Sequence, residues 1–194
     1  MKALSPLYGF HGTTLAAAKE IIAAGRFEES AAQSEWLGRG VYFWEDDPVR
    51  ALEWAKRKNP EKRERELCVI GALVDSARCL DLSTRYGVEQ LKCAYEILVE
   101  KYKKAGMPLP KNTGGPLEMN RKLDCAVLNT FFDAMRKTKS GFSAVKSPFF
   151  EGEAAYEGAF FFERTHTQIC VNDQKCILAT FFVRDAAAWE KSGA

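Results

Sequence analysis

The sequence predicts a mixed α+β fold with strands near both ends of the chain and helices in the middle. Three apolar segments near the N-terminus have the length and composition of strands: residues 7–13, 40–44 and 67–74. Two later segments repeat apolar residues at helical spacing: residues 88–102 and 117–136. Two segments near the C-terminus are again strand-like: residues 167–171 and 177–183. Because strands precede and follow the helices, this order favours one α+β domain over residues 1–194, with a helical insertion at 83–138.

Capping residues predict the ends of two further helices. Thr14 can cap a segment rich in alanine and isoleucine, and Gly25 can end it. Asp46-Asp47-Pro48 combines an acidic N-cap with proline in the first turn, so a second helix starts there and ends at Asn59-Pro60. Residues without periodicity, or rich in proline and glycine, are predicted loops: 27–39 and 106–116. One apolar and two aromatic-rich segments are weaker strand candidates: residues 79–82, 149–150 and 159–162.

Composition and charge are those of an ordinary globular protein. The 194 residues are 46% hydrophobic and 28% charged, and the net charge of +2 is too small to select a partner class. Basic residues do cluster in segments 56–65 and 101–122, which could meet phosphates. Charge runs of this kind are more often solvated helix faces.

The cysteines and the apolar segments indicate whether a metal site or a membrane span is expected and which cellular compartment is favoured. Six cysteines occur without a CxxC pair and only two histidines are present, so we expect no zinc or other metal site. We also expect no secretory leader and no membrane span, because no long apolar segment is found. Free thiols without an export signal favour the cytoplasm.

Two short motifs carry the functional signal. Phe10-His11-Gly12-Thr13 places a histidine at a strand end, beside a glycine that lets a ligand approach the backbone closely. This combination suits binding of a ribose hydroxyl by the imidazole and of an amide by the glycine main chain. The second motif, Gly38-Arg39-Gly40-Val41-Tyr42-Phe43, leads into a strand that presents Tyr42, and Trp54 follows on the next helix. The two rings could enclose a flat ligand ring, although each ring alone is better explained by core packing.

In this order the motifs resemble those of the diphtheria-toxin-like, poly(ADP-ribose)-polymerase-type ADP-ribosyltransferases. That family carries His-Gly-Thr/Ser, then Gly-x-Gly-x-Tyr-Phe, then a strand with a Glu. The resemblance implies a split antiparallel β-sandwich with flanking helices. It also implies an enzyme, a glycosyltransferase that uses NAD as substrate, releases nicotinamide and transfers ADP-ribose.

The resemblance further implies roles for individual residues. His11 would hold the NAD ribose, and the Gly12 main chain would bind the nicotinamide amide with support from Thr13. Tyr42 and Trp54 would stack on the nicotinamide. Ala51 stands where the family often has a serine, with Arg50 beside it as a possible substitute. The residues implied to bind NAD are His11, Gly12, Thr13, Arg39, Gly40, Tyr42, Ala51, Trp54 and Gln168, of which His11, Tyr42 and Gln168 would be catalytic.

The third motif departs from the family pattern. The best counterpart strand is Gln168-Ile169-Cys170-Val171-Asn172, which puts Gln168 where the catalytic Glu would be. A glutamine can bond a ribose hydroxyl, but it can neither act as a general base nor place negative charge beside a developing cation. We therefore expect transfer of a single ADP-ribose rather than chain elongation. His166 should share a strand face with Gln168.

Acids in the preceding loop are candidates to supply the missing charge, although such residues usually face solvent. They are Glu151, Glu153, Glu157 and Glu163.

The acceptor and the biological setting follow only from the resemblance. The acceptor would be a macromolecule, either nucleic acid or protein. A small transferase of this kind would suit a toxin or a phage-defence effector with an antitoxin or immunity partner. The alternative is a module that binds NAD or ADP-ribose without catalysis. An enzyme that transfers an RNA phosphate to NAD is disfavoured, since the sequence lacks the paired arginine and histidine such a site uses.

Overall fold

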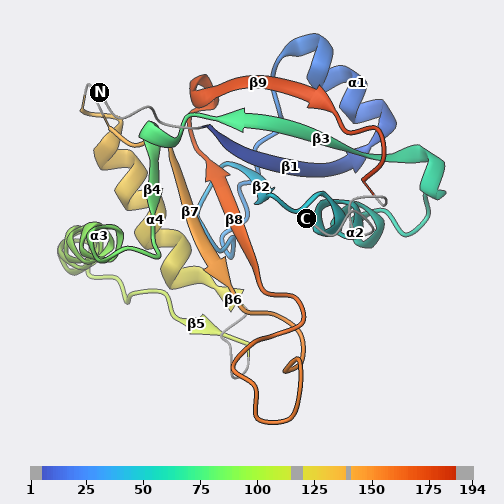
Figure 1. Cartoon of the computed structure of the whole chain (residues 1–194). Helices are drawn as coiled ribbons and strands as arrows, with labels where there is room; N and C mark the ends of the chain where they lie inside the picture. The colour runs from blue at the N-terminus through green and yellow to red at the C-terminus, as the bar shows by residue number, and fades with distance from the viewer. Residues whose placement is uncertain (1–5, 115–119, 139–140, 187–194) are drawn as a thin grey trace.

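The computed structural model describes residues 6–114, 120–138 and 141–186, which form one large mixed sheet with helices packed on it (Figure 1). The seven strands follow the order β4-β7-β8-β2-β1-β3-β9, and neighbours are antiparallel except for the parallel pair β4 and β7. Strand bounds are β1 Leu7–Thr14, β2 Val41–Glu45, β3 Leu67–Val74, β4 Cys79–Asp81, β7 Ala144–Phe149, β8 His166–Val171 and β9 Ile177–Phe182. The predicted α+β class is confirmed.

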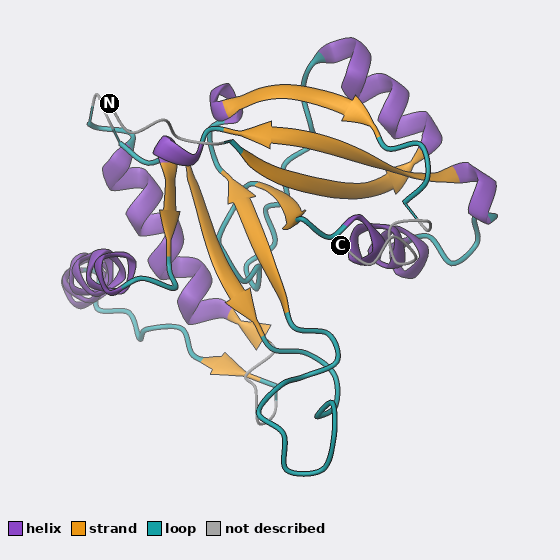
Figure 2. Ribbon diagram, in the orientation of Figure 1, coloured by secondary structure: helices purple, strands orange, loops and turns teal. Residues whose placement is uncertain are grey.

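The described helices are α1 (Leu15–Ala24), α2 (Pro48–Lys58), α3 (Arg85–Lys104) and α4 (Lys122–Met135). Figure 2 shows α3 and α4 beside the β4–β7–β8 half of the sheet, and α1 and α2 beside the β1–β3–β9 half. A separate two-stranded ladder, β5 (Asn112–Thr113) and β6 (Asn120–Arg121), lies between α3 and α4 in the chain. Both long helices fall within the segment for which a helical insertion is predicted.

The sheet opens between β1 and β2. These strands pair only at Gly9 with Glu45 and at Phe10 with Trp44. Beyond that point β1 continues along β3 to Thr14, while β2 continues along β8. The two halves of the sheet run in different directions in Figure 1, with β1, β3 and β9 across the top and β7 and β8 descending from them. The C-terminal half of β1 and the N-terminal half of β2 therefore bound a gap in the hydrogen-bonded ladder.

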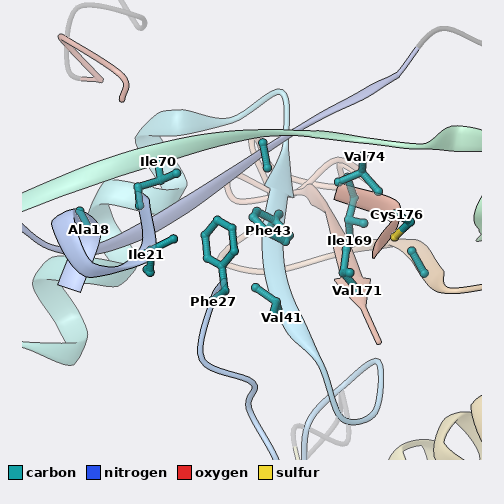
Figure 3. Close-up of a cluster of buried hydrophobic side chains, with 12 residues drawn as sticks. Ala18, Ile21, Phe27, Val41, Phe43, Ile70, Val74, Ile169, Val171 and Cys176 are labelled. Atoms are coloured by element: carbon teal, nitrogen blue, oxygen red, sulfur yellow. The ribbon is translucent and has the colours of Figure 1, made fainter. Parts of the chain in front are cut away.

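Buried apolar side chains form three clusters. The first lies against the inner face of the bent sheet, where Phe27 reaches towards Phe43 on β2 and Ile169 and Val171 come from β8 (Figure 3). The second packs α3 and α4 on the other face of β7 and β8, and the third packs α2 on β1 and β3. Alternation along β2 divides its side chains between them: Val41 and Phe43 join the first cluster, Tyr42 the second and Trp44 the third.

The ends of α1 and α2 lie where their capping residues predicted them. The Thr14 hydroxyl accepts a hydrogen bond from the Ala17 N–H at 3.2 Å, and Gly25 ends α1 with φ of 64°. The Asp47 carboxylate caps α2 by accepting from the Arg50 N–H at 2.8 Å, with Pro48 in the first turn. Strand β3 has the predicted bounds.

Three predicted elements differ from the structure. Residues 159–162 form no strand beyond a single bridge between Ala154 and Phe162, and Phe160 is 89% exposed because no neighbouring strand covers it. Strand β7 begins at Ala144, well before the predicted 149–150, since its polar Lys146 and its Pro148 obscure the apolar pattern. Helix α4 starts at Lys122; the first residues of the predicted helix, 117–119, lie outside the described residues.

Candidate functional site

A cleft of about 1010 Å³ opens where β1 and β2 separate. Its walls come from β1, α1, the loop after α1, β2, α2, the loop after β7 and β8, so residues distant in sequence meet there. The size is at the upper end for small-molecule and cofactor sites. Of the residues predicted to bind NAD, the cleft is lined by His11, Thr13, Gly40, Tyr42, Trp54 and Gln168.

His11 is held in place by a hydrogen bond from one ring nitrogen to a backbone carbonyl and by two aromatic neighbours, and its other ring nitrogen makes no bond to this carbonyl. Its Nδ1 lies 2.8 Å from the Tyr42 carbonyl oxygen, which can only accept, so Nδ1 carries the proton. The ring also makes edge contacts with Phe27 and Phe43 at centroid distances of 5.4 and 5.9 Å. Burial lowers the pKa of His11, against a smaller opposite effect of the Tyr42 hydrogen bond. The neutral ring therefore offers Nε2 as an acceptor for a hydroxyl.

Gly12 and Ala51 have a packing role rather than a place on the cleft wall. A Cβ added at Gly12 would lie 1.7 Å from the Ala51 carbonyl oxygen and 3.1 Å from the Ala55 side chain. Helix α2 thus approaches β1 so closely that only glycine fits. Ala51 is fully buried in the third cluster and does not line the cleft.

Tyr42 presents its ring to the cleft while its phenol is used inside the protein. The hydroxyl donates to the Gly38 carbonyl at 2.6 Å and accepts from the Leu37 N–H at 2.9 Å. Burial, followed by the nearby Cys170 and Glu35, raises the pKa of the Tyr42 phenol far above its usual range. The phenol therefore stays protonated, and what Tyr42 can give a ligand is a rigid ring surface.

The turn before β2 is fixed by α4 and β8. The Arg39 N–H donates to the Asn129 side-chain oxygen, and the Arg39 carbonyl accepts from the Asn172 amide, both at 2.8 Å. Gly38 has φ of 80°, in the left-handed region that favours glycine. A Cβ at Gly40 would lie 2.5 Å from the Val171 carbonyl oxygen. Arg39 therefore anchors the turn through its backbone and does not line the cleft.

Trp54 is accompanied by a second tryptophan that the sequence reasoning missed. Trp44 on β2 lies 5.7 Å from Trp54 between ring centroids, with the planes inclined by 51°. Trp44 is buried, and its Nε1 has no hydrogen-bond partner among the described residues. Trp54 is 36% exposed, with the cationic groups of Arg57 and Lys58 at 5.6 and 5.5 Å from its ring. Strand alternation from Tyr42 was the signal that could have identified Trp44, because the two side chains share a face.

Gln168 lies directly opposite Trp44 in the β2–β8 register. Its amide nitrogen is 3.0 Å from His166 Nε2, and His166 Nδ1 is 2.8 Å from the Arg164 carbonyl. Since that carbonyl accepts from Nδ1–H, Nε2 is the acceptor for the Gln168 amide. This contact confirms that His166 and Gln168 share a face. It also orients the Gln168 carboxamide, whose oxygen has no partner within the described part of the chain.

Only one of the four candidate loop acids reaches the site. Glu151, directly after β7, lines the cleft together with Gln168. Glu151 also lines a smaller adjoining recess of about 210 Å³, whose other walls are Trp44, Arg50, Glu53, Trp54, Arg57, Arg164 and Gln168.

Glu151 is joined to α2 by an ion pair. Its Oε2 lies 2.6 Å from Nη2 of Arg50, and Nη1 of Arg50 reaches Glu53 at 2.5 Å. The other three candidate acids are exposed and do not line either hollow: Glu153, Glu157 and Glu163.

No described helix combines the length and apolarity that a membrane crossing requires. No group of three or more His, Cys, Asp or Glu residues in the described ranges is arranged to hold a metal ion.

Comparison with known proteins adds one partial similarity. No protein-family model matches the chain, and no solved structure matches it. Over 78 residues the chain is 31% identical to an uncharacterized protein of Methanocaldococcus jannaschii. The match covers 38% of this chain and 36% of the archaeal protein, so the chain spans little more than a third of that relative.

Proposed function

We propose that the chain is an NAD-dependent mono-ADP-ribosyltransferase. The observation that carries the proposal is the convergence of His11, Tyr42, Trp54 and Gln168, from β1, β2, α2 and β8, on one cleft. The order of the two N-terminal motifs supports it. The opening of the sheet between β1 and β2 is also what a split β-sandwich of this family would require.

Each side chain has a task that its geometry suits. The rings of Tyr42 and Trp54 would hold the flat nicotinamide, and Nε2 of His11 would accept a hydrogen bond from a ribose hydroxyl. The free oxygen of Gln168 would accept from the hydroxyl of the nicotinamide ribose. In the reaction the C1′–N bond breaks and nicotinamide leaves with the bonding electrons. The acceptor nucleophile then attacks C1′ and loses its proton, and much of the acceleration comes from positioning.

The acceptor would be a nucleic acid or a protein. The basic segment 56–65 starts on α2, where Arg57 and Lys58 line the cleft, and this favours phosphate-bearing acceptors. The loop between β7 and β8 exposes four large aromatic side chains that favour a protein surface: Phe150, Tyr156, Phe160 and Phe161. A toxin or defence effector, with an antitoxin or immunity partner, remains the setting that the family resemblance suggests.

Release of nicotinamide from NAD by the purified chain tests the proposal. Wild type, His11→Ala and Gln168→Ala would each be assayed alone and with RNA, DNA or protein extract, using NAD labelled in the adenylate. Release that depends on His11, with label moving to one acceptor class, is the expected result. Absence of release with every acceptor would refute the transferase.

A module that binds NAD or ADP-ribose without catalysis is the second candidate. The neutral Gln168 favours it, because its amide is engaged by His166 and the strand position offers no charge. Quenching of Trp44 and Trp54 fluorescence by NAD, without any nicotinamide release, is the outcome that this candidate predicts.

A further inference from the structure

We propose that Glu151 is the catalytic carboxylate of this site, supplied by the loop after β7, and that Arg50 is its positioning residue. The inference rests on the proposed transferase activity and assigns within it the negative charge that Gln168 does not provide. Breaking the C1′–N bond leaves positive charge on the ribose, and a fixed anion next to that charge stabilises the transition state. The acceptor must also lose a proton as it attacks C1′, and a carboxylate can take it.

The position of Glu151 suits a fixed anion next to the positive charge on the ribose. Together with Gln168 and Trp54, Glu151 lines both the cleft and the adjoining recess. A carboxylate there lies next to the ribose if Gln168 bonds its hydroxyl and Trp54 holds the nicotinamide. In this arrangement an acceptor group would approach the same carbon from the adjoining recess, which Glu151 and Gln168 also line.

The contacts of Glu151 leave it able to take the proton of the acceptor. Its Oε2 is held by Arg50 at 2.6 Å, across 101 residues of sequence, while Oε1 has no partner among the described residues. The pair is well shielded, with side chains 17% and 19% exposed for Arg50 and Glu151. A shielded, charge-assisted bond orients a carboxylate more firmly than an exposed ion pair does. One oxygen is thus fixed, and the other is available to substrate.

A neighbouring acid in the same loop, Glu153, differs from Glu151 in its position. Glu153 is exposed and lines neither hollow, although it lies only two residues from Glu151. A general effect of negative charge in the loop would appear equally at both positions, whereas a catalytic role would appear at Glu151 alone.

The test compares Glu151→Gln and Arg50→Lys with the matched control Glu153→Gln. For each variant, kcat for nicotinamide release would be measured beside the Kd for NAD from tryptophan quenching and the melting temperature. Glu151→Gln keeps the shape of the side chain, so we expect kcat to fall about 100-fold or more, the scale of losing one preorganised electrostatic contact, with Kd changed less than about threefold. Arg50→Lys should lower kcat less, since lysine keeps the charge but loses the planar fork. Glu153→Gln should match wild type.

Two results would overturn the assignment in different ways. If wild type releases nicotinamide and Glu151→Gln does so at a similar rate, the catalytic role of Glu151 is wrong and the transferase stands. If wild type releases none, both the transferase and the role of Glu151 fail together.

Discussion

Replacing Gly12 with alanine should destabilise the protein even when no ligand is present. The new Cβ would lie 1.7 Å from the Ala51 carbonyl oxygen, whereas ordinary contacts of this kind begin at 3.4 Å. Helix α2 would therefore have to withdraw by about 1.7 Å, and it is held there by fully buried Ala51 and Ala55. A radial gap of about 1 Å already removes a quarter to a half of the dispersion contacts across an interface. We expect a loss of about 3 kcal/mol in the free energy of unfolding, at the upper end for overpacked cores.

Thermal unfolding measures this effect. For a chain of this length, about 3 kcal/mol corresponds to a melting temperature lower by about 6–12 °C. Gly106→Ala is the control, because its Cβ would meet nothing within 4 Å while its φ of 63° carries only the left-handed backbone strain, about 1 kcal/mol. If Gly12→Ala melts no lower than Gly106→Ala, the close approach of α2 to β1 is not what requires glycine. Loss of NAD binding by a fully stable Gly12→Ala would instead favour a direct contact of this backbone with ligand.

Four further outcomes follow from the geometry of the site and the core. Trp54→Ala should weaken NAD binding by about 1–3 kcal/mol in a quenching or calorimetric titration, while Tyr42→Phe should keep affinity and lower stability by about 1–2 kcal/mol through its lost hydrogen bonds. Burial lowers the pKa of His11 from its usual 6.5, so the unfolded chain takes up the proton at a higher pH than the folded chain does. Stability should therefore fall as the pH drops below 6.5. His11→Asn should reduce this pH dependence in thermal melts between pH 5.5 and 7.5. In mapping of alkylation by mass spectrometry, exposed Cys93 should react well before Cys79, because burial raises the pKa of the Cys79 thiol to about 12.

The sequence was most informative where a feature is decided by neighbours along the chain. Thr14, Gly25 and Asp47 could be read as caps because capping involves residues two or three positions apart. Strand β3 was equally clear, since its nearly continuous apolar run is buried on both faces. Strand β7 was not clear from the sequence, because a lysine inside a strand needs a partner for its charge. The partner of Lys146 is Glu45, which is distant in the sequence and whose carboxylate lies 2.7 Å from the Lys146 ammonium.

In the cleft, too, the sequence predicted local features better than contacts between distant residues. The motifs directed attention to His11, Tyr42 and Gln168, all of which line it. The packing reason for Gly12 could not be predicted, because it depends on the path of α2 over β1. The pairing of Arg50 with Glu151 was equally hidden, as nothing local connects residues 101 positions apart.

The ion pair between Arg50 and Glu151 also has a mechanical consequence for the proposed site. Arg50 belongs to the same helix as Trp54, and that helix is seated on β1 by the Gly12 contact. Glu151 belongs to a loop between two strands of the other half of the sheet, so the ion pair joins elements that belong to the two halves. A ligand ring against Trp54 and a ribose beside Gln168 would then meet surfaces whose separation the pair helps to fix. Because positioning supplies much of the acceleration in such a transfer, a tether of this kind can matter for rate without any contact between Arg50 and the substrate.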